Sequence, residues 1–260
     1  MPPAVPRHGL ARVLSKRGLC SRTQAAEWIR DGRVAVNGRV VRDPEFPVRM
    51  DADRVDVRDL AAAAALPIYI ALNKPRGLVT TARDERGRDT VYRCFDGANL
   101  PWIAPVGRLD KASEGLLLFS NDPRWASSIT DPASGPQKTY HVQTDRIPDA
   151  ATLHAMQSGV DVDDERLAAA NATLLRSGAR NAWLEITLDE GRNRHIRRLL
   201  EAFDIGVLRL VRVAIGTLPL GELAKGAWRP LTADEARALG PIRAVGDVKA
   251  PSTFSSDRRA

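Results

Sequence analysis

The residues best suited to chemistry lie in one short stretch, 106–122. Asp110 stands there between Arg108 and Lys111, just ahead of an apolar run at 116–119. Cations beside a carboxylate favour its ionised form, in which it can act as a nucleophile or a base. A glycine and a polar turn bound the apolar run, a pattern typical of a strand covered on both faces. The stretch therefore places a carboxylate that could react at the start of a buried strand, although most acids beside a glycine turn are solvated turn residues.

Length and charge narrow the class of protein and of partner. The chain has 260 residues and a formal net charge of +7, with an isoelectric point of about 9.9. This length suggests one or two domains. The excess of positive charge favours an anionic partner, with nucleic acid the first expectation and a membrane surface the second.

The cysteines, histidines and apolar runs exclude several other classes. The two cysteines and four histidines show no metal or redox spacing, so we expect no metal site and reduced thiols in a cytoplasmic protein. No apolar run approaches the ~20 residues needed to cross a bilayer, so no membrane partner is expected. The first residues carry no apolar segment of the kind found in signal peptides.

The stretch around Asp110 resembles a known catalytic signature. Residues 107–110 read Gly-Arg-Leu-Asp, and a small hydroxyl residue, a glycine and Leu-Leu follow at 113–117. This string is similar to the signature of RNA pseudouridine synthases, and most of all to the RsuA/RluB/RluE/RluF group that modifies ribosomal RNA. The resemblance implies that Asp110 is the catalytic nucleophile.

Two further motifs follow in the order found in that family. The Lys-x-Tyr-x-Val motif around Tyr140 implies that its ring stacks on the target uracil. Residues 190–198 read Glu-Gly-Arg-Asn-Arg-His-Ile-Arg-Arg, which implies that Arg197 forms an ion pair with the catalytic carboxylate. His195 stands where the family has glutamine, and no role is carried to it. Taken alone, a tyrosine in a strand is usually a core or edge residue, and a basic helix start is an RNA-facing surface.

The resemblance also implies how the substrate is held and changed. Arg108 would fill the space left by the flipped nucleotide or hold a flanking phosphate, and Ile215 would lie against the base. A buried isoleucine needs no such role, so packing alone also explains it. Asp110 would attack C1′ of the ribose or assist a route through a glycal, and the sequence leaves both open. Isomerisation of uridine oxidises nothing and loses no group, so no cofactor is expected.

The N-terminal segment carries most of the excess charge. Residues 7–43 hold nine basic and three acidic residues. Helical apolar spacing and an Asn-Gly turn between two valine-rich arms predict two helices followed by a hairpin. The segment resembles the S4 RNA-binding domain, in which basic side chains grip phosphates with little sequence choice. The candidate RNA-binding residues are Arg12, Lys16, Arg22, Arg30 and Arg33.

Together these patterns predict an α+β protein of two domains. We expect a small α-rich S4 domain at 7–60 and a mainly antiparallel, mixed-sheet pseudouridine synthase domain at 68–240. A disordered tail would follow at 241–260. An alanine-rich change of composition at 60–66 marks the expected boundary, although alanine would equally favour a short helix there.

The expected partner is ribosomal RNA, either naked or within a pre-ribosomal particle, and a monomer is the default state. The resemblance favours 23S over 16S RNA as the target. Two other classes remain open at this point. One is a non-catalytic S4-type RNA-binding or ribosome-assembly protein, and the other is a translation or stress factor that works through its S4 domain.

Overall fold

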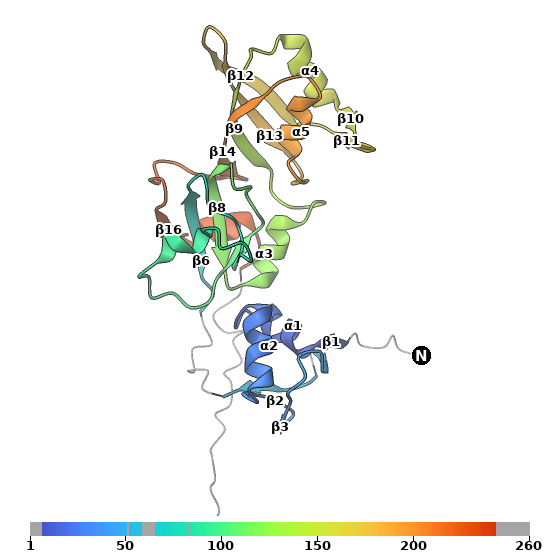
Figure 1. Ribbon diagram of the computed structural model, residues 1–260, viewed down its shortest axis with the longest axis vertical. Coiled ribbons are helices and arrows are strands. Elements are labelled where there is room, and N and C mark those ends of the chain that lie inside the picture. The colour runs from blue at the N-terminus through green and yellow to red at the C-terminus, as the bar shows by residue number, and fades with distance from the viewer. Residues whose placement is uncertain (1–6, 51, 59–65, 83, 243–260) are drawn as a thin grey trace, which may run out of the picture.

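The computed structural model describes residues 7–50, 52–58, 66–82 and 84–242. It has a small N-terminal unit of short helices and strands, followed by a long sheet flanked by helices (Figure 1). The predicted α+β class is thereby confirmed. Most of the predicted boundary at 60–66 and of the predicted tail at 241–260 lies outside the described residues. In the described part of the chain, no helix is both long and apolar enough to span a membrane.

The N-terminal unit has the two helices and the hairpin that its sequence predicts. Ser21 caps the second helix by accepting a hydrogen bond from the backbone of Gln24, and Asn37 and Gly38 both take positive φ angles in the hairpin turn. Residues 10–48 supply a separate apolar core between the helices and the strands. The elements are β1 (Arg7–Gly9), α1 (Leu10–Lys16), α2 (Arg22–Arg30), β2 (Val34–Val36), β3 (Arg39–Val40), β4 (Pro47–Arg49) and β5 (Val55–Val57).

The larger part is built on one nine-stranded sheet within the described residues. Along its main path the strands run in the order β12-β13-β9-β14-β8-β6-β16, with β7 paired to β8 and β15 paired to β14. All neighbours are antiparallel except β14 and β8, which are parallel. The strands are β6 (Tyr69–Lys74), β7 (Ala104–Val106), β8 (Glu114–Ser120), β9 (Lys138–Thr144), β12 (Asn171–Ser177), β13 (Ala182–Leu188), β14 (Val207–Ile215), β15 (Leu218–Pro219) and β16 (Trp228–Pro230).

Helices cover both faces of this sheet and close two apolar cores. Trp125 of α3 is fully buried in one core, where its indole Nε1 donates to the carbonyl of Ala236 in α6 at 2.8 Å. The other core lies under η1, α4 and α5. The helices are η1 (Val91–Phe95), α3 (Pro123–Thr130), α4 (Ala150–Ser158), α5 (His195–Glu201) and α6 (Ala233–Leu239).

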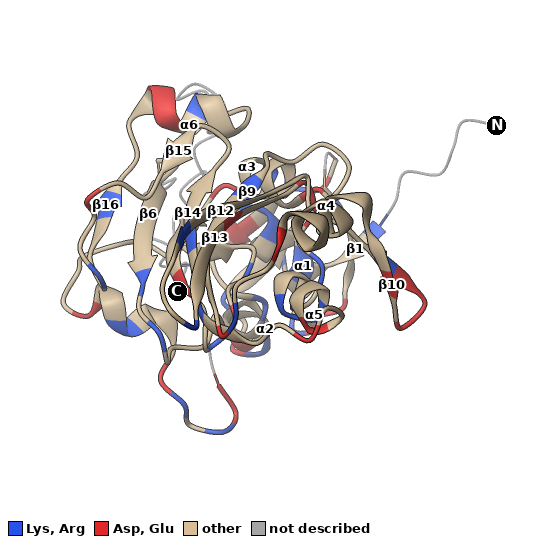
Figure 2. Ribbon diagram, turned by 90° about the horizontal axis from the view of Figure 1, so that it is seen from above, with Lys and Arg blue, Asp and Glu red and all other residues tan. Residues whose placement is uncertain are grey.

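Strand β8 runs through the middle of the sheet and is buried along its whole length. Leu117 and Phe119 enter one core, and Leu116 and Leu118 enter the other. The prediction of a strand covered on both faces is therefore confirmed. The acidic segment at 160–164 forms β10 (Val160–Val162) and the turn into β11 (Glu165–Leu167), and Figure 2 shows its acidic tip at the edge of the molecule.

Candidate active site

The turn that carries Asp110 joins β7 to β8 and is fixed by backbone contacts. Gly107 begins it with a φ of +75°, and the N–H of Ser113 donates to the carbonyl of Asp110 at 3.0 Å. The hydroxyl of Thr80 donates to the carbonyl of Leu109 at 2.7 Å and accepts from its N–H at 3.3 Å. The reactive carboxylate therefore sits on a turn whose backbone is held from a second loop.

Lys74, the last residue of β6, holds the same turn from within the protein. Its side chain is fully buried. Its ammonium group donates to the carbonyls of Ser113 at 2.8 Å, Asp110 at 3.1 Å and Pro75 at 3.2 Å. Burial lowers the pKa of Lys74 to about 8, against an opposing attraction from Asp110. A buried charge that bonds to three carbonyls fixes the backbone at Asp110 and at Ser113, and ties both to Pro75.

A cavity of about 360 Å³ opens beside this turn. Six basic and two acidic residues are among the described residues that line it, so the cavity suits an anionic substrate. Every residue predicted for catalysis or substrate contact faces it, although the residues come from four separate segments of the chain. They are Asp110, Tyr140, Arg197, Arg108 and Ile215.

Strands β9 and β14 form the floor of the cavity. Tyr140 is opposite Arg212, and Lys138 is opposite Ile215. Paired residues of antiparallel strands point to the same face of the sheet. Arg212 and Ile215 are three residues apart, and they share this face because a bulge between Arg212 and Ala214 inserts one residue into β14. Tyr140 is buried with only 8% of its surface exposed.

Arg197 comes from α5 and faces Asp110 across the cavity. Its Nη1 donates to the carbonyl of Val207 at 3.3 Å, and its Nε is buried without a partner in the described part of the chain. Burial and the nearby Arg194 lower the pKa of Arg197, whereas attraction to Asp110 raises it. Among the described residues no hydrogen bond or ion pair within 4.0 Å joins Arg197 to Asp110, so the structure differs from the direct pair expected from the sequence.

His195 begins α5 and is 3% exposed. Burial lowers the pKa of His195, so the ring is neutral at neutral pH. The imidazole of His195 thus contributes an uncharged wall to the cavity.

A second cavity, of about 610 Å³, continues the first toward the surface. Arg108, Arg192 and Arg194 line both cavities, and residues 79–81, 84–86 and 88 line the second alone. Asp84 and Arg88 form an ion pair of 2.6 Å. A basic entrance of this kind matches the backbone of a nucleic acid strand.

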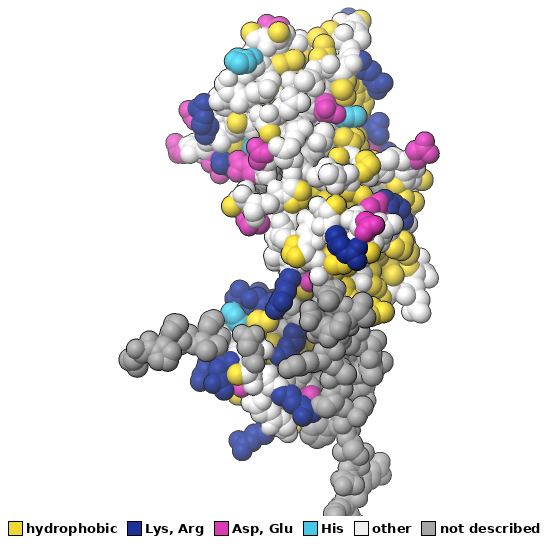
Figure 3. Space-filling model, turned by 180° about the vertical axis from the view of Figure 1, so that it is seen from behind, with side chains coloured by type: hydrophobic (Ala, Val, Ile, Leu, Met, Phe, Trp, Pro, Cys, Tyr) yellow, Lys and Arg dark blue, Asp and Glu magenta, His cyan; other side chains and the backbone are white. Residues whose placement is uncertain are grey.

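The S4-like unit presents a separate basic surface. Figure 3 shows Lys and Arg side chains gathered over the described part of this unit. Arg33 differs from the other candidates because it is half-buried, lies over the ring of Trp28 at 5.2 Å and donates to the carbonyl of Arg58. The candidates whose side chains are exposed are Arg12, Lys16, Arg22 and Arg30.

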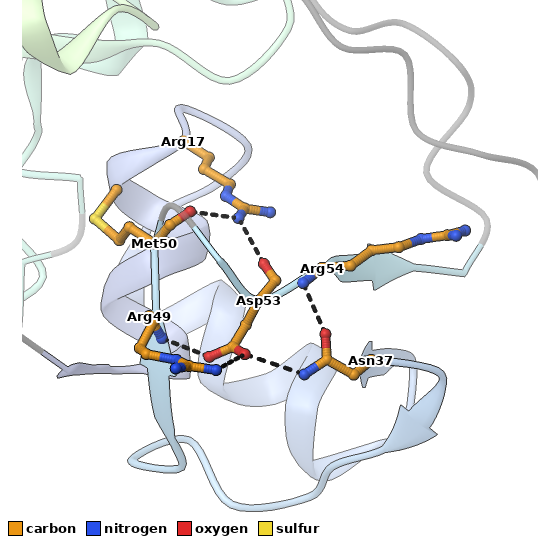
Figure 4. A network of polar contacts seen from close by, with 6 residues as sticks. All are labelled: Arg17, Asn37, Arg49, Met50, Asp53 and Arg54. Carbon is orange, nitrogen blue, oxygen red and sulfur yellow. Dashed lines mark hydrogen bonds and ion pairs between the residues drawn. The ribbon is translucent and has the colours of Figure 1, made fainter. Parts of the chain in front are cut away.

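Some of the basic residues in this unit hold its own fold together. Arg17 donates to the carbonyls of Met50 and Asp53 at 3.3 and 3.4 Å (Figure 4). The carboxylate of Asp53 accepts from Asn37 at 3.1 Å and from the backbone of Arg49 at 2.7 Å. These hydrogen bonds, the backbone bond of Arg49 above all, lower the pKa of Asp53 to about 2. The network ties the hairpin turn to the segment before β5.

Comparison with known proteins agrees with this geometry. The profile of the RNA pseudouridylate synthase family matches residues 68–202, and that of the S4 domain matches residues 9–55. Ribosomal large subunit pseudouridine synthase B of Bacillus subtilis (strain 168) is 35% identical over 92% of this chain and 96% of its own. The enzyme of the same name from Shigella flexneri is 36% identical over 85% of this chain and 79% of its own. A crystal structure of a pseudouridylate synthase superposes with a TM-score of 0.63 and 28% identity, covering 90% of this chain and 99% of that one.

The sheet, the basic cavity and the RNA-binding unit define an RNA-modifying isomerase. The chain belongs to the RNA pseudouridylate synthase family, whose members convert uridine to pseudouridine in RNA, and an S4 domain precedes its catalytic part. Sequence reasoning identified the residues that carry the family motifs. It gave no role to Thr80, Lys138 or Arg212, whose positions depend on contacts between distant segments.

Proposed function

We propose that this protein converts a specific uridine of ribosomal RNA to pseudouridine, with 23S RNA favoured over 16S RNA. The names of the relatives from Bacillus subtilis and Shigella flexneri, both large subunit synthases, support this target. The observation that carries the catalytic proposal is the cavity shared by Asp110, Tyr140 and Arg197. It combines a carboxylate, an aromatic ring and a cation in a space of about 360 Å³, which suits one nucleotide held outside its helix.

The carboxylate of Asp110 is the proposed nucleophile or base. After the target nucleotide leaves the stack, the N1–C1′ bond of the uridine breaks, either by attack of Asp110 at C1′ or through a glycal. The uracil turns in the cavity, C5 bonds to C1′, N1 gains a proton and C5 loses one. The reaction oxidises nothing and loses no group, so it needs neither a metal nor a cofactor.

The other lining residues hold the base and the carboxylate in place. The ring of Tyr140 stacks on the uracil, and Ile215 provides an apolar wall beside it. Arg197 lies across the cavity from Asp110 and attracts it through its positive charge. Arg108, at the border of the two cavities, fills the vacated stack or holds a flanking phosphate.

The S4 domain supplies most of the affinity for RNA through its exposed cations. Contacts of this kind go to phosphates, so binding weakens steeply as salt is added and depends little on sequence. Selection of one uridine therefore falls to the catalytic cavity and to the fold of the RNA. We propose that the protein acts in the cytoplasm as a monomer, on naked ribosomal RNA or on a pre-ribosomal particle.

The proposal is tested by mapping pseudouridine in ribosomal RNA from wild-type and gene-deleted cells, by carbodiimide treatment and reverse-transcription stops. We expect one stop in 23S RNA to disappear on deletion and to return with the wild-type gene. An unchanged map in both ribosomal RNAs would contradict the proposed substrate. Loss of a 16S site instead would keep the reaction and overturn the preference for 23S RNA.

A further inference from the structure

Arg212 is a buried arginine at the floor of the catalytic cavity. It is 5% exposed and lines the cavity from β14, opposite Tyr140. On its other side it is paired with Gly115 of β8, where a Cβ atom would lie 2.3 Å from the carbonyl oxygen of Arg212. The glycine allows the two strands to approach closely. This arrangement places a guanidinium group deep in the protein, beneath the site of the target base.

One nitrogen of the Arg212 guanidinium group is buried without a partner among the described residues. Its Nε donates to the carbonyl of Leu116 at 2.7 Å, while its Nη2 is buried with no hydrogen-bond partner in the described part of the chain. Buried polar groups are nearly always paired, and leaving a donor unpaired costs stability. A hydrogen-bond acceptor on the substrate would pair with this buried donor.

The charged groups near Arg212 do not supply the missing partner for its guanidinium. Two cations lie close enough for Arg212 to act on them: it lowers the pKa of Lys138 after the larger effect of burial, and it is the smallest of the causes that set the pKa of Lys74. Glu114, the acid nearest along β8, already accepts from Arg209 at 2.9 Å and from Lys225 at 2.6 Å. No carboxylate of the described residues lies within 4.0 Å of the Arg212 guanidinium. The floor of the cavity is thus positive and lacks a matching anion.

The reaction itself produces such an anion. When the N1–C1′ bond breaks, its electron pair leaves with the uracil and spreads over N1, O2 and O4. The pair later forms the C5–C1′ bond, so the charge exists only during the reaction. Because donors placed where charge develops stabilise the transition state more than the ground state, a free guanidinium at this depth has a use that a surface cation lacks.

We propose that Arg212 is a catalytic residue that donates a hydrogen bond to a carbonyl oxygen of the flipped uracil and stabilises the uracil anion as the glycosidic bond breaks. Lys138, half-buried on the neighbouring strand and also lining the cavity, adds positive charge on the same face. The phosphates of the RNA meet the arginines of the outer cavity instead. This inference rests on the proposed function and holds for either route of attack by Asp110.

The test compares Arg212→Met and Arg212→Lys with the wild-type protein. Single-turnover rates are measured with excess protein on a ribosomal RNA fragment that contains the target, and RNA affinity is measured separately. Arg209→Met is the matched control, because it removes a cation from the same strand outside the cavity. We expect Arg212→Met to lower the rate about 100-fold or more while the dissociation constant changes less than about threefold. Arg212→Lys should recover part of the loss, and the control should stay near wild type.

A second substrate separates a catalytic role from a structural one. Fluorine at C5 withdraws electrons and stabilises the uracil anion, so an RNA with 5-fluorouridine at the target depends less on Arg212. The deficit of Arg212→Met in N1–C1′ cleavage should shrink about tenfold on this RNA. A disturbed fold would slow both substrates equally, and that outcome overturns the proposal.

Two other outcomes would also contradict the catalytic role of Arg212. A folded Arg212→Met protein with a rate within threefold of wild type removes the catalytic role. If Arg212→Met instead weakens RNA binding and lowers its salt dependence, Arg212 contacts a phosphate of the RNA and not the uracil. If Arg212→Met does not fold, the same pair of substrates is used with Arg212→Lys. Failure of the wild-type protein to form any pseudouridine would contradict the proposed function instead, so the two failures are distinguishable.

Discussion

Replacement of Lys74 by methionine tests how the catalytic turn is held. Lys74 is fully buried and donates to three carbonyls, those of Ser113, Asp110 and Pro75. Hydrogen bonds from a charged group contribute about 1.5–3 kcal/mol each, but holding the charge inside the protein costs part of that gain. Because burial lowers the pKa of Lys74 from 10.5 to about 8, this penalty is about 3 kcal/mol at neutral pH. We expect Lys74→Met to destabilise the protein by about 2–4 kcal/mol at pH 7.

The same pKa shift fixes how this difference depends on pH. Between pH 8 and 10.5 the unfolded chain binds a proton at Lys74 that the folded protein has lost, so the stability of the wild type rises with pH in this window. The contribution of Lys74 to the free energy of unfolding is complete above pH 10.5 and falls as the pH is lowered to about 8. The difference between wild type and Lys74→Met should therefore grow by about 3 kcal/mol from pH 8 to 10.5. Subtracting the two proteins cancels the other groups that titrate there.

Urea unfolding followed by tryptophan fluorescence measures this difference. Four of the five tryptophans lie after residue 66, so the signal reports mainly on the catalytic domain. Lys111→Met, which removes an exposed lysine from the same turn, is the matched control and should change stability by less than about 0.5 kcal/mol. A difference between Lys74→Met and wild type that is small at pH 7, or constant from pH 8 to 10.5, would refute the reasoning.

Three further predictions concern the other parts of the molecule. Trp125→Phe removes the buried bond to the carbonyl of Ala236 and should lower stability by about 1–3 kcal/mol in urea unfolding; no change would contradict its structural role. Asp53→Asn should lower the stability of the protein above pH 3.8. In acid unfolding its difference from wild type should vanish as the pH falls through about 2, because the pKa of Asp53 is lowered to that value. Changing Arg12 and Arg22 together to glutamine should weaken RNA binding and reduce the slope of log K against log salt by about 1.5. An unchanged slope would remove both residues from the RNA interface.

Sequence patterns predicted the structure correctly where a few neighbouring residues decide it. The apolar run at 116–119 predicted the buried strand β8. The start of α6 is also set by near neighbours, because Thr232 and Glu235 form a reciprocal capping box. The Asn-Gly turn likewise predicted the hairpin of the N-terminal unit. In each case hydrogen bonds and side-chain periodicity within about ten residues fix the geometry.

Such local patterns could not predict how distant segments of the chain are arranged. The parallel pairing of β14 with β8 joins Val211 to Glu114, nearly a hundred positions apart, and no local signal encodes it. The bulge that turns Arg212 into the cavity depends on the register of β14 against β9. Lys74 resembles a solvated lysine in a Pro/Gly turn, and its burial becomes evident only when the Asp110 turn closes over it. Tertiary contacts therefore decide which polar residues belong to the site.

Asp110→Asn tests most directly whether Asp110 performs the isomerisation. Purified wild-type and Asp110→Asn proteins are incubated with 23S RNA from gene-deleted cells, and pseudouridine is mapped by carbodiimide-dependent reverse-transcription stops. We expect one new stop with the wild type and none with Asp110→Asn, while both proteins bind the RNA with similar affinity. Substantial pseudouridine formed by Asp110→Asn would contradict the assignment of the catalytic residue.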